Sequence, residues 1–281
     1  MKKLVMLFAI ACMLLVACSD DSGNNSGSND FSQDIPLCES CEYGSLTDAR
    51  DGQKYRTVKI GAQWWMAENL NFAYNQPTEE FDSSSVCIDN YPENCKKYGR
   101  FYMWSAAMDS VGLFSTNGLG CGKGNVLCGQ SYPVRGVCPE GWHLPSDSEI
   151  KTLFISVGGS PDENGEFRTS FNEGSKLALC REKNPSGFAA IPIAKKGGGR
   201  ICDNNDKSEL IECKKNFFYF RMDKRYEDDE KNASDFWSSL SIKNEDGDGG
   251  YFFSIRCYDD YAAIEYARVD SELKSVRCVK D

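Results

Sequence analysis

The most regular hydrophobic pattern lies at the start of the chain. After Lys2 and Lys3, residues 4–16 form an almost unbroken apolar run, whereas residues 19–30 contain no apolar side chain. Thirteen apolar residues are too few for a permanent membrane-spanning helix, but they suit the hydrophobic region of a secretion signal. The pattern predicts a signal peptide at 1–17, an anchor residue and flexible tether at 18–44, and one globular domain at 45–281.

The apolar run ends in Leu15-Val16-Ala17-Cys18, which matches the lipobox of bacterial lipoprotein signals residue for residue. In such signals the cysteine is acylated, palmitate being one such acyl group, and the peptide is cut just before it. Several acyl chains give a durable anchor, whereas a single chain holds only marginally. We therefore expect Cys18 to be lipidated and the protein to be anchored in the cell envelope, at the outer membrane and exposed at the surface. A plain cleaved signal and an uncut anchor are the alternatives.

Short strands are predicted in the globular part. Residues 47–60 predict a β-hairpin, because Asp51-Gly52 supplies the positive φ angles of a tight turn. Aromatic and β-branched residues such as Tyr55 and Val58 favour strands on either side of such a turn. Two further strands are predicted near the end of the chain, at 251–257 and 273–279.

The clearest helix start is at residues 146–149. The hydroxyl of Ser146 can accept the amide of Glu149, while the Glu149 side chain returns to the Ser146 amide. An apolar stripe at helical spacing follows, and Gly158 ends the helix; the stripe consists of Ile150, Leu153, Phe154 and Val157. The chain as a whole predicts an α+β domain with few helices, short antiparallel strands and long disulfide-stapled loops.

The net charge and the single histidine reduce the number of functions that the chain can have. The chain has 32 basic and 42 acidic residues, a formal net charge of −10 and a pI of about 4.8. Such a chain cannot neutralise a row of phosphates, so we expect no nucleic acid partner. The single histidine, His143, leaves little room for histidine-based catalysis or zinc binding. It sits just before the predicted helix, and we expect it to be a structural residue bonded to the backbone.

The cysteines indicate an oxidising compartment. Fourteen cysteines are too many for an ordinary cytosolic protein. Twelve remain once Cys12 is lost with the signal and Cys18 to the lipid, and an even number predicts a disulfide framework. Short loops favour three local pairs, Cys87–Cys95, Cys121–Cys128 and Cys202–Cys213. The first two pairs lie in loops that we expect at 75–97 and 117–134. Cys138 and Cys278 are further disulfide candidates. Zinc is the alternative, but only Cys38 and Cys41 have the required spacing.

One acidic stretch resembles the start of a calcium loop. Asn244, Asp246 and Asp248 place oxygens at positions one, three and five before a glycine. Position twelve would be Ile255, where such a loop needs a bidentate glutamate. A turn between two strands is therefore favoured over a calcium site. We expect no resident metal and no cofactor.

Several stretches together resemble the Fibrobacter succinogenes major paralogous domain family of exported bacterial proteins. They follow the family's order over about 45–281, with long divergent insertions. The matching stretches are Thr47–Tyr55, Lys59–Asn71, Tyr98–Trp104, Gly136–Ser146 with Glu149, Gly187–Pro192, Phe236–Ser239 and Ser275–Asp281.

The resemblance implies a variant of the C-type-lectin-like fold, which also hosts formylglycine-generating enzymes. It brings no defined catalytic activity, and a fold does not by itself imply a function. The cysteine-based active-site motif of the formylglycine-generating branch is not visible in the sequence. The Glu-Pro-Asn and Trp-Asn-Asp signatures of calcium-dependent lectins are not visible either.

Aromatic residues are the candidate ligand contacts. The five tryptophans lie inside the family stretches, which favours core positions; Trp64 and Trp65 are the exceptions to consider, because adjacent strand residues face opposite ways. Tyr258 and Tyr261 are weaker candidates. The expected function is non-catalytic binding at the envelope, with a polysaccharide or a cell-surface partner. A structural protein that contacts other envelope proteins and a glycan-active hydrolase are the alternatives.

Overall fold

The computed structural model describes residues 35–77, 84–122, 124–128, 130–162, 169–179, 183–193, 195–200, 218–222, 233–244, 247–257, 260–269 and 272–281. The expectations for Cys18, for the Cys202–Cys213 pair, for Tyr258 and for Asp246 fall outside these ranges. Within them the chain is a mixed α+β structure with few, short helices, as the sequence predicts. None of the helices in these ranges is long and apolar enough to cross a membrane.

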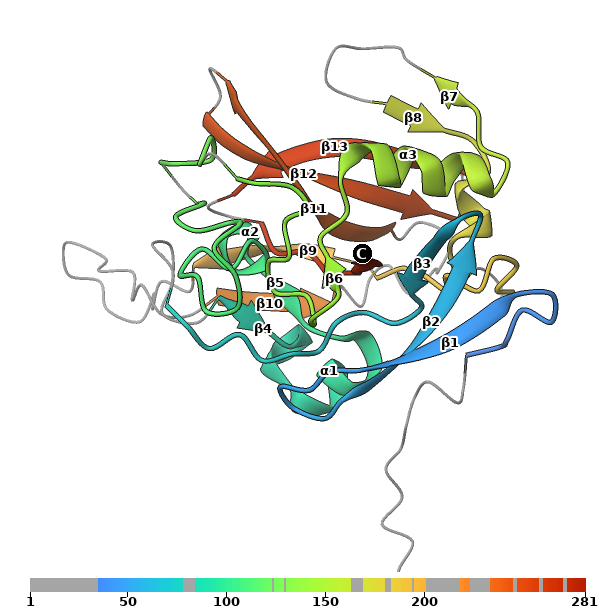
Figure 1. Ribbon diagram of the computed structural model, residues 1–281, viewed down its shortest axis with the longest axis horizontal. Coiled ribbons are helices and arrows are strands. Elements are labelled where there is room, and N and C mark those ends of the chain that lie inside the picture. The colour runs from blue at the N-terminus through green and yellow to red at the C-terminus, as the bar shows by residue number, and fades with distance from the viewer. Residues whose placement is uncertain are drawn as a thin grey trace, which may run out of the picture.

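The first sheet contains the predicted hairpin. Its order is β1 (Glu42–Thr47), β2 (Lys54–Ile60), β3 (Gln63–Met66), β14 (Val279–Lys280) and β6 (Trp142–His143), and every pairing is antiparallel. The β1–β2 turn carries Gly52 at a φ of +75°, which only glycine adopts without strain. The hairpin stands at the lower right of Figure 1, in blue. The predicted hairpin is confirmed, with strands displaced by a few residues.

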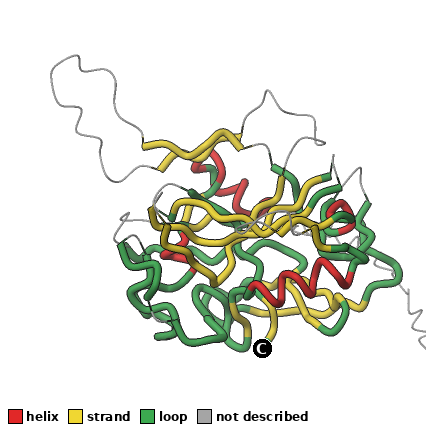
Figure 2. Tube along the Cα trace, turned by 90° about the horizontal axis from the view of Figure 1, so that it is seen from above, coloured by secondary structure: helices red, strands yellow, loops and turns green. Residues whose placement is uncertain are grey.

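The second sheet is built from the later part of the chain. Its order is β11 (Ala233–Asn244), β12 (Gly247–Arg256), β13 (Ala262–Arg268), β8 (Thr169–Phe171) and β7 (Pro161–Asp162). β12 confirms the strand predicted at 251–257. Two small two-stranded sheets complete the strands, β4 (Ser85–Val86) with β5 (Phe101–Tyr102) and β9 (Lys195–Arg200) with β10 (Phe218–Met222). Loops make up much of the trace between these strands (Figure 2).

The longest described helix begins where the sequence predicts. In α3 (Asp147–Ser156), Ser146 is the N-cap and forms the reciprocal capping box with Glu149. Ile150, Leu153 and Phe154 are buried, and α3 packs against β11 and β13 (Figure 1). The other helical segments are α2 (Trp104–Ala107), α1 (Pro92–Tyr98), and the 3₁₀ turns η2 (Ile88–Asn90) and η3 (Gly174–Lys176).

The core contains tryptophan rings from both sheets. Trp65 is fully buried and meets Phe188 and Phe253 edge-on, with ring centroids 5.9 and 6.2 Å apart. Trp104 and Trp237 are fully buried in the neighbouring apolar cluster. Their indole nitrogens donate to the carbonyls of Ser238 and Tyr102 respectively, so no buried indole N–H is left without an acceptor in this pair.

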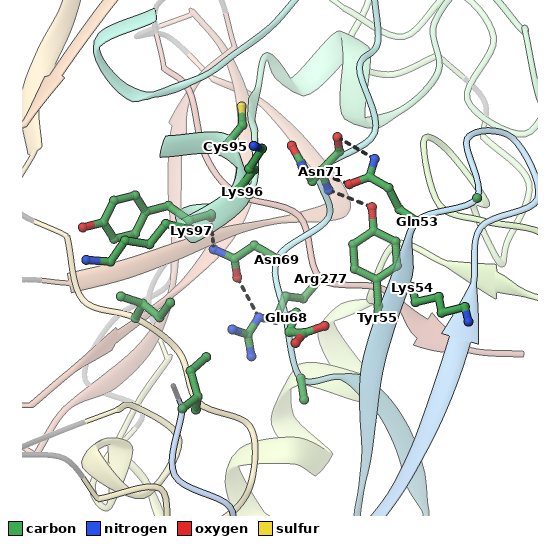
Figure 3. A pocket seen from close by; sticks show the side chains of 16 residues that line it. Gln53, Lys54, Tyr55, Glu68, Asn69, Asn71, Cys95, Lys96, Lys97 and Arg277 are labelled. Carbon is green, nitrogen blue, oxygen red and sulfur yellow. Dashed lines mark hydrogen bonds between the residues drawn. The ribbon is translucent and has the colours of Figure 1, made fainter. Parts of the chain in front are cut away.

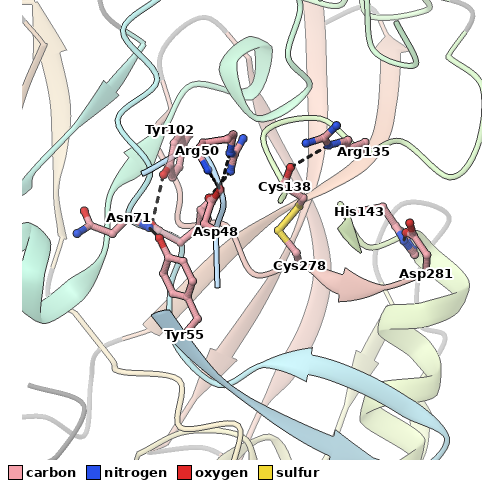
Figure 4. Close-up of a disulfide and its surroundings, with 11 residues drawn as sticks. Asp48, Arg50, Tyr55, Asn71, Tyr102, Arg135, Cys138, His143, Cys278 and Asp281 are labelled. Carbon is pink, nitrogen blue, oxygen red and sulfur yellow. Dashed lines mark hydrogen bonds and ion pairs between the residues drawn. A yellow bond between two sulfur atoms is a disulfide. The ribbon is translucent and has the colours of Figure 1, made fainter. Parts of the chain in front are cut away.

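The disulfides confirm two predicted pairs and correct one alternative. Cys87–Cys95 and Cys121–Cys128 are bonded as expected. Cys38 and Cys41 form a disulfide as well, so their spacing does not indicate a zinc site. Cys257 is disulfide-bonded too. The candidates Cys138 and Cys278 bond to each other across 140 positions (Figure 4).

The stretch 75–97 is more ordered than a stapled loop. Its described part contains β4, η2 and α1, and the Cys87–Cys95 bond ties the start of η2 to α1. α1 begins with Pro92, which suits the first helical position because its missing N–H has no partner there anyway. A seven-residue polar helix has no apolar stripe for a sequence pattern to show. The loop prediction is therefore wrong for this part.

The strand predicted at 273–279 is mostly wrong, because this segment changes partner almost at every residue. Lys274 pairs with Tyr102 and Ser275 with Phe236, each as an isolated bridge. The carbonyls of Val276 and Cys278 accept the amides of Leu70 and Met66. Only Val279–Lys280 forms a regular strand. A segment that contacts several elements in turn cannot keep one register, so it joins the two sheets and belongs wholly to neither.

Candidate functional site

The two adjacent tryptophans proposed as ligand contacts lie on opposite faces of β3. Trp65 is buried, so its ring cannot stack on a surface ligand, and that candidate is wrong. Trp64 is half-buried and lies across the sheet, where a Cβ on Gly44 would be 3.2 Å from its ring. Gly44 thus leaves room for the indole. Trp64 stays a candidate contact residue, and so does the half-buried Tyr261, which lies under the guanidinium of Arg256.

Asn244 and Asp248, from the acidic stretch, lie at the end of the β11–β12 hairpin. Asn244 pairs with Gly247 where β11 turns into β12, as the favoured turn interpretation predicts. The Asp248 carboxylate accepts the backbone amide of Gly124 from a neighbouring loop. Within the described ranges no group of three metal-ligating side chains is found. In the structure Asp248 therefore anchors a loop.

His143 is buried between two carboxylates. Its Nδ1 lies 2.6 Å from Asp281 Oδ1 and its Nε2 lies 2.9 Å from Glu149 Oε1. The expected backbone partner is therefore wrong. Burial lowers the pKa of His143, but the hydrogen bonds to Glu149 and Asp281 outweigh it, so the pKa is raised overall. Ser146 bonds the other oxygen of Glu149, and the cluster holds the start of α3 against the C-terminal segment.

A pocket of about 510 Å³ lies where the β1–β2 turn, residues 67–71, α1 and the C-terminal segment meet (Figure 3). Six stretches of the chain supply its walls, including single residues at Ile35, Ile191 and Arg277. β2 and its turn contribute residues 52–55, and α1 contributes residues 95–98. The volume lies within the range of small-ligand sites. This pocket is the candidate functional site.

Arg277 forms part of its inner wall. Arg277 is 1% exposed. Its Nε donates to Asn69 Oδ1 over 2.8 Å, and its two terminal nitrogens donate to the carbonyls of Phe188 and Ala189. Asn69 is in turn fixed by donating to the Tyr98 carbonyl over 2.8 Å. The pocket wall is therefore held by a chain of bonds from the C-terminal segment to the end of α1.

Amide side chains line the opposite wall. Asn71 Nδ2 donates to Gln53 Oε1 over 2.9 Å, and the side-chain Nε2 of Gln53 donates back to the backbone carbonyl of Asn71. The Asn71 backbone amide donates to the hydroxyl of Tyr55 over 3.1 Å. Burial raises the pKa of Tyr55 well above its usual value, so this hydroxyl stays protonated. This wall is therefore polar and uncharged, and its side chains bond largely to one another.

The charge of the lining is opposite to that of the chain. Lys54, Lys96, Lys97 and Arg277 are basic, whereas Glu68 alone is acidic, which gives a local formal charge of +3 in a chain of −10. Burial lowers the pKa of Arg277 to about 9, and the nearby Glu68 carboxylate opposes this shift. Arg277 is therefore still protonated at neutral pH. The lining of the pocket therefore carries a net positive charge at neutral pH.

The sequence did not single out this pocket, because its parts are far apart along the chain. Asn69 and Asn71 lie in the Lys59–Asn71 stretch and Arg277 lies in Ser275–Asp281. The one available signal for the pocket was the presence of these polar residues among apolar neighbours in the two stretches. A strand in the core would carry apolar residues at such positions. Nothing in the spacing of the residues shows that the two stretches meet.

The comparisons with known proteins bear on the family alone. The sequence profile described as the Fibrobacter succinogenes major domain matches residues 58–280. No curated protein and no solved structure gave a match. The matched range includes β3, α1, α3, the second sheet and the C-terminal segment, and thus most of the pocket. The chain belongs to the Fibrobacter succinogenes major domain family.

Proposed function

We propose that the protein is a lipid-anchored module of the bacterial cell envelope that binds a polysaccharide without cleaving it. The lipobox ending at Cys18 and the polar tether after it support the anchor and an outer-membrane, surface-exposed location. The disulfides support an oxidising compartment, since every cysteine in the described ranges is bonded.

The pocket beside Arg277 is the observation that carries the binding part of the proposal. A cavity of about 510 Å³ accommodates one or two sugar rings. Its internal hydrogen bonds leave a second N–H on Asn71 Nδ2 and a second lone pair on Gln53 Oε1 for sugar hydroxyl groups. Half-buried Tyr98 also lines the pocket, with Lys97 Nζ 5.0 Å from the centroid of its ring.

The presence of one carboxylate among the described lining residues favours binding over hydrolysis. Glycoside hydrolases generally use a pair of carboxyl groups that flank the scissile bond. Among the described lining residues Glu68 is the one carboxylate. Its Oε2 accepts the backbone amide of Arg56 over 2.7 Å and its Oε1 lies 3.5 Å from the Arg56 guanidinium. Glu68 is thus held as a structural anion.

We further propose that the domain is a variant of the C-type-lectin-like fold. Support comes from the pairing of β14, at the C-terminus, with β3 near the domain's start, so that both ends of the domain share one sheet. The Cys138–Cys278 bond fixes this closure covalently. An experimental structure whose two sheets and α3 superpose on that fold would support this assignment, and a different strand order would overturn it.

The binding proposal is tested with oxidised, soluble residues 19–281 on insoluble cellulose, xylan, mannan and peptidoglycan. We expect saturable retention on one polymer, no released sugar, and weaker retention for Gln53→Ala, which removes a neutral pocket contact. Lys151→Ala, on α3 outside the pocket, is the matched control and should bind as the wild type does. Released sugar would favour the hydrolase alternative. Retention on no polymer would favour a scaffold role with protein partners.

A further inference from the structure

The pocket lining carries four basic side chains and one carboxylate, Glu68. Three of the four basic lining residues, Lys54, Lys96 and Lys97, are exposed at its rim, while the fourth, Arg277, is buried. Lys96 pairs with Glu93 on α1, over 2.9 Å. An exposed pair of this kind contributes little stability and dissociates easily.

Arg277 is bound only by neutral oxygens among the described residues. Its three acceptors are one amide oxygen and two carbonyls, and its guanidinium stacks over the rings of Phe188 and Phe236, 4.4 and 5.2 Å from their centroids. A buried charge ordinarily has an ionised partner, because removing it from water is costly. Here the partner is absent from the described part of the protein.

Glu68 does not supply the missing partner. It is the acidic residue whose field acts on Arg277, but its Oε2 accepts the backbone amide of Arg56 and its Oε1 lies 3.5 Å from the Arg56 guanidinium. One carboxylate therefore faces two arginines. The lining as a whole has a formal charge of +3, which favours an anion in the cavity.

We propose that the pocket binds an anionic saccharide, with the carboxylate of a uronate residue on the positive side of the pocket. This inference rests on the proposed function and names its ligand class. The carboxylate lies in the field of Arg277 and within reach of Lys54 and Lys96, while the sugar hydroxyls bond to Gln53 and Asn71. A neutral sugar satisfies the amides but leaves the charge of Arg277 uncompensated.

The test compares matched ligands by titration calorimetry: tri-galacturonate, its neutral counterpart galactotriose, and galactose 6-phosphate as a phosphate-bearing sugar. We expect tri-galacturonate to bind most tightly. Lys54→Ala with Lys96→Ala should weaken it on the order of tenfold, because two charge-assisted contacts are removed at the rim. Lys151→Ala, which removes the same charge elsewhere, should leave its affinity unchanged. Raising the salt concentration should weaken binding of the acidic ligand by screening the charges.

The outcomes separate this inference from the binding proposal. Equal affinity for galactotriose and tri-galacturonate, both reduced in Gln53→Ala, would keep the polysaccharide module and overturn the anionic ligand. Tighter binding of galactose 6-phosphate would overturn the uronate in favour of a phosphate. If no saccharide binds in either experiment, both proposals fall. Unchanged affinity for tri-galacturonate in the double lysine variant would also overturn this inference, because the ligand would then lie elsewhere.

Discussion

The imidazole of His143 lies 2.6 Å from the carboxylate of Asp281, which joins the start of α3 to the C-terminal segment. The second ring nitrogen meets Glu149 at 2.9 Å. Two carboxylates on one ring favour the protonated imidazolium, in which both nitrogens donate. This contact makes the stability of the domain dependent on pH.

The first prediction concerns that pH dependence. The pKa of His143 is raised above about 6.5, so its contribution is complete below pH 6.5 and is lost as the pH rises through the folded value. The pKa of Glu149 is lowered from 4.5, because the hydrogen bonds to His143 and Ser146 outweigh burial; its contribution is lost as the pH falls through that lowered value. The cluster should therefore stabilise most between about pH 4.5 and 6.5.

Because the chain has one histidine, a proton NMR titration reports His143 without ambiguity. We expect a midpoint above 6.5 in the folded protein. The free energy of unfolding, measured with urea between pH 5 and 9, should decline as the pH rises in the wild type but not in His143→Gln. An unchanged decline in His143→Gln would mean that other groups govern the pH dependence.

The second prediction concerns Asp109, a fully buried carboxylate. It accepts the Tyr74 hydroxyl at 2.8 Å and the backbone amides of Leu113, Phe114 and Ser115 at 2.7 to 3.0 Å. Asp109→Ala should cost about 3 kcal/mol or more, because it leaves several buried donors unpaired. Tyr74→Phe, which removes one of the four bonds, should cost about 1 kcal/mol. Urea unfolding measures both, and similar losses would contradict this account.

The third prediction compares two disulfides. Removing Cys138–Cys278 as a double alanine variant frees a loop of 140 positions and should cost about 4–5 kcal/mol on the chain-entropy scale. Removing Cys87–Cys95, which spans 8 positions, should cost about 2.5 kcal/mol. Denaturant midpoints of the two variants give the comparison. The reverse order would show that native packing, and not loop length, decides the loss.

The fourth prediction separates the neighbouring tryptophans. Trp65→Ala empties a site in the core and should cost about 3–5 kcal/mol of the free energy of unfolding. Trp64→Ala removes a half-buried ring and should cost less, with a folded domain at room temperature. Circular dichroism and thermal melting distinguish the two. Equal losses would show that Trp64 contributes to the core as much as Trp65 does.

The fifth prediction concerns the anchor. In a bacterial host, Cys18→Ser should remove palmitate labelling and shift the protein from the membrane fraction to the soluble fraction, because no acyl chain can then be attached. Cys12→Ser, within the signal, is the matched control and should leave both unchanged. Labelling that persists in Cys18→Ser would place the lipid on another residue.

Local features were the ones that the sequence could predict. The capping box of Ser146 and Glu149 and the turn at Gly52 involve residues within a few positions, so local geometry alone determines them. The Cys87–Cys95 and Cys121–Cys128 pairs followed from short loops in the same way. The pairing of Cys138 with Cys278 depends on how both sheets close, which no local pattern encodes.

The candidate site was missed for the same reason. Asn69 and Arg277 touch across 208 positions, and the role of each depends on the other. Arg277 in isolation looks like a surface cation in a strand, and only the packing of Phe188 and Phe236 against it reveals a buried charge. Gln53 and Lys54 belong to the predicted hairpin, but the hairpin prediction says nothing about the pocket behind its turn.

The C-terminal segment sets an order of events for folding. Residues 274–281 bridge β5, β11, β3 and β6, and Cys278 closes the disulfide with Cys138. In a chain that emerges N-terminus first, the first sheet lacks β14, the strand between β3 and β6, until residues 274–281 arrive, and Cys138 lacks its partner Cys278 until then. Until then the thiol of Cys138 can pair with another cysteine, so the docking of residues 274–281 is the step that commits the domain to the Cys138–Cys278 disulfide.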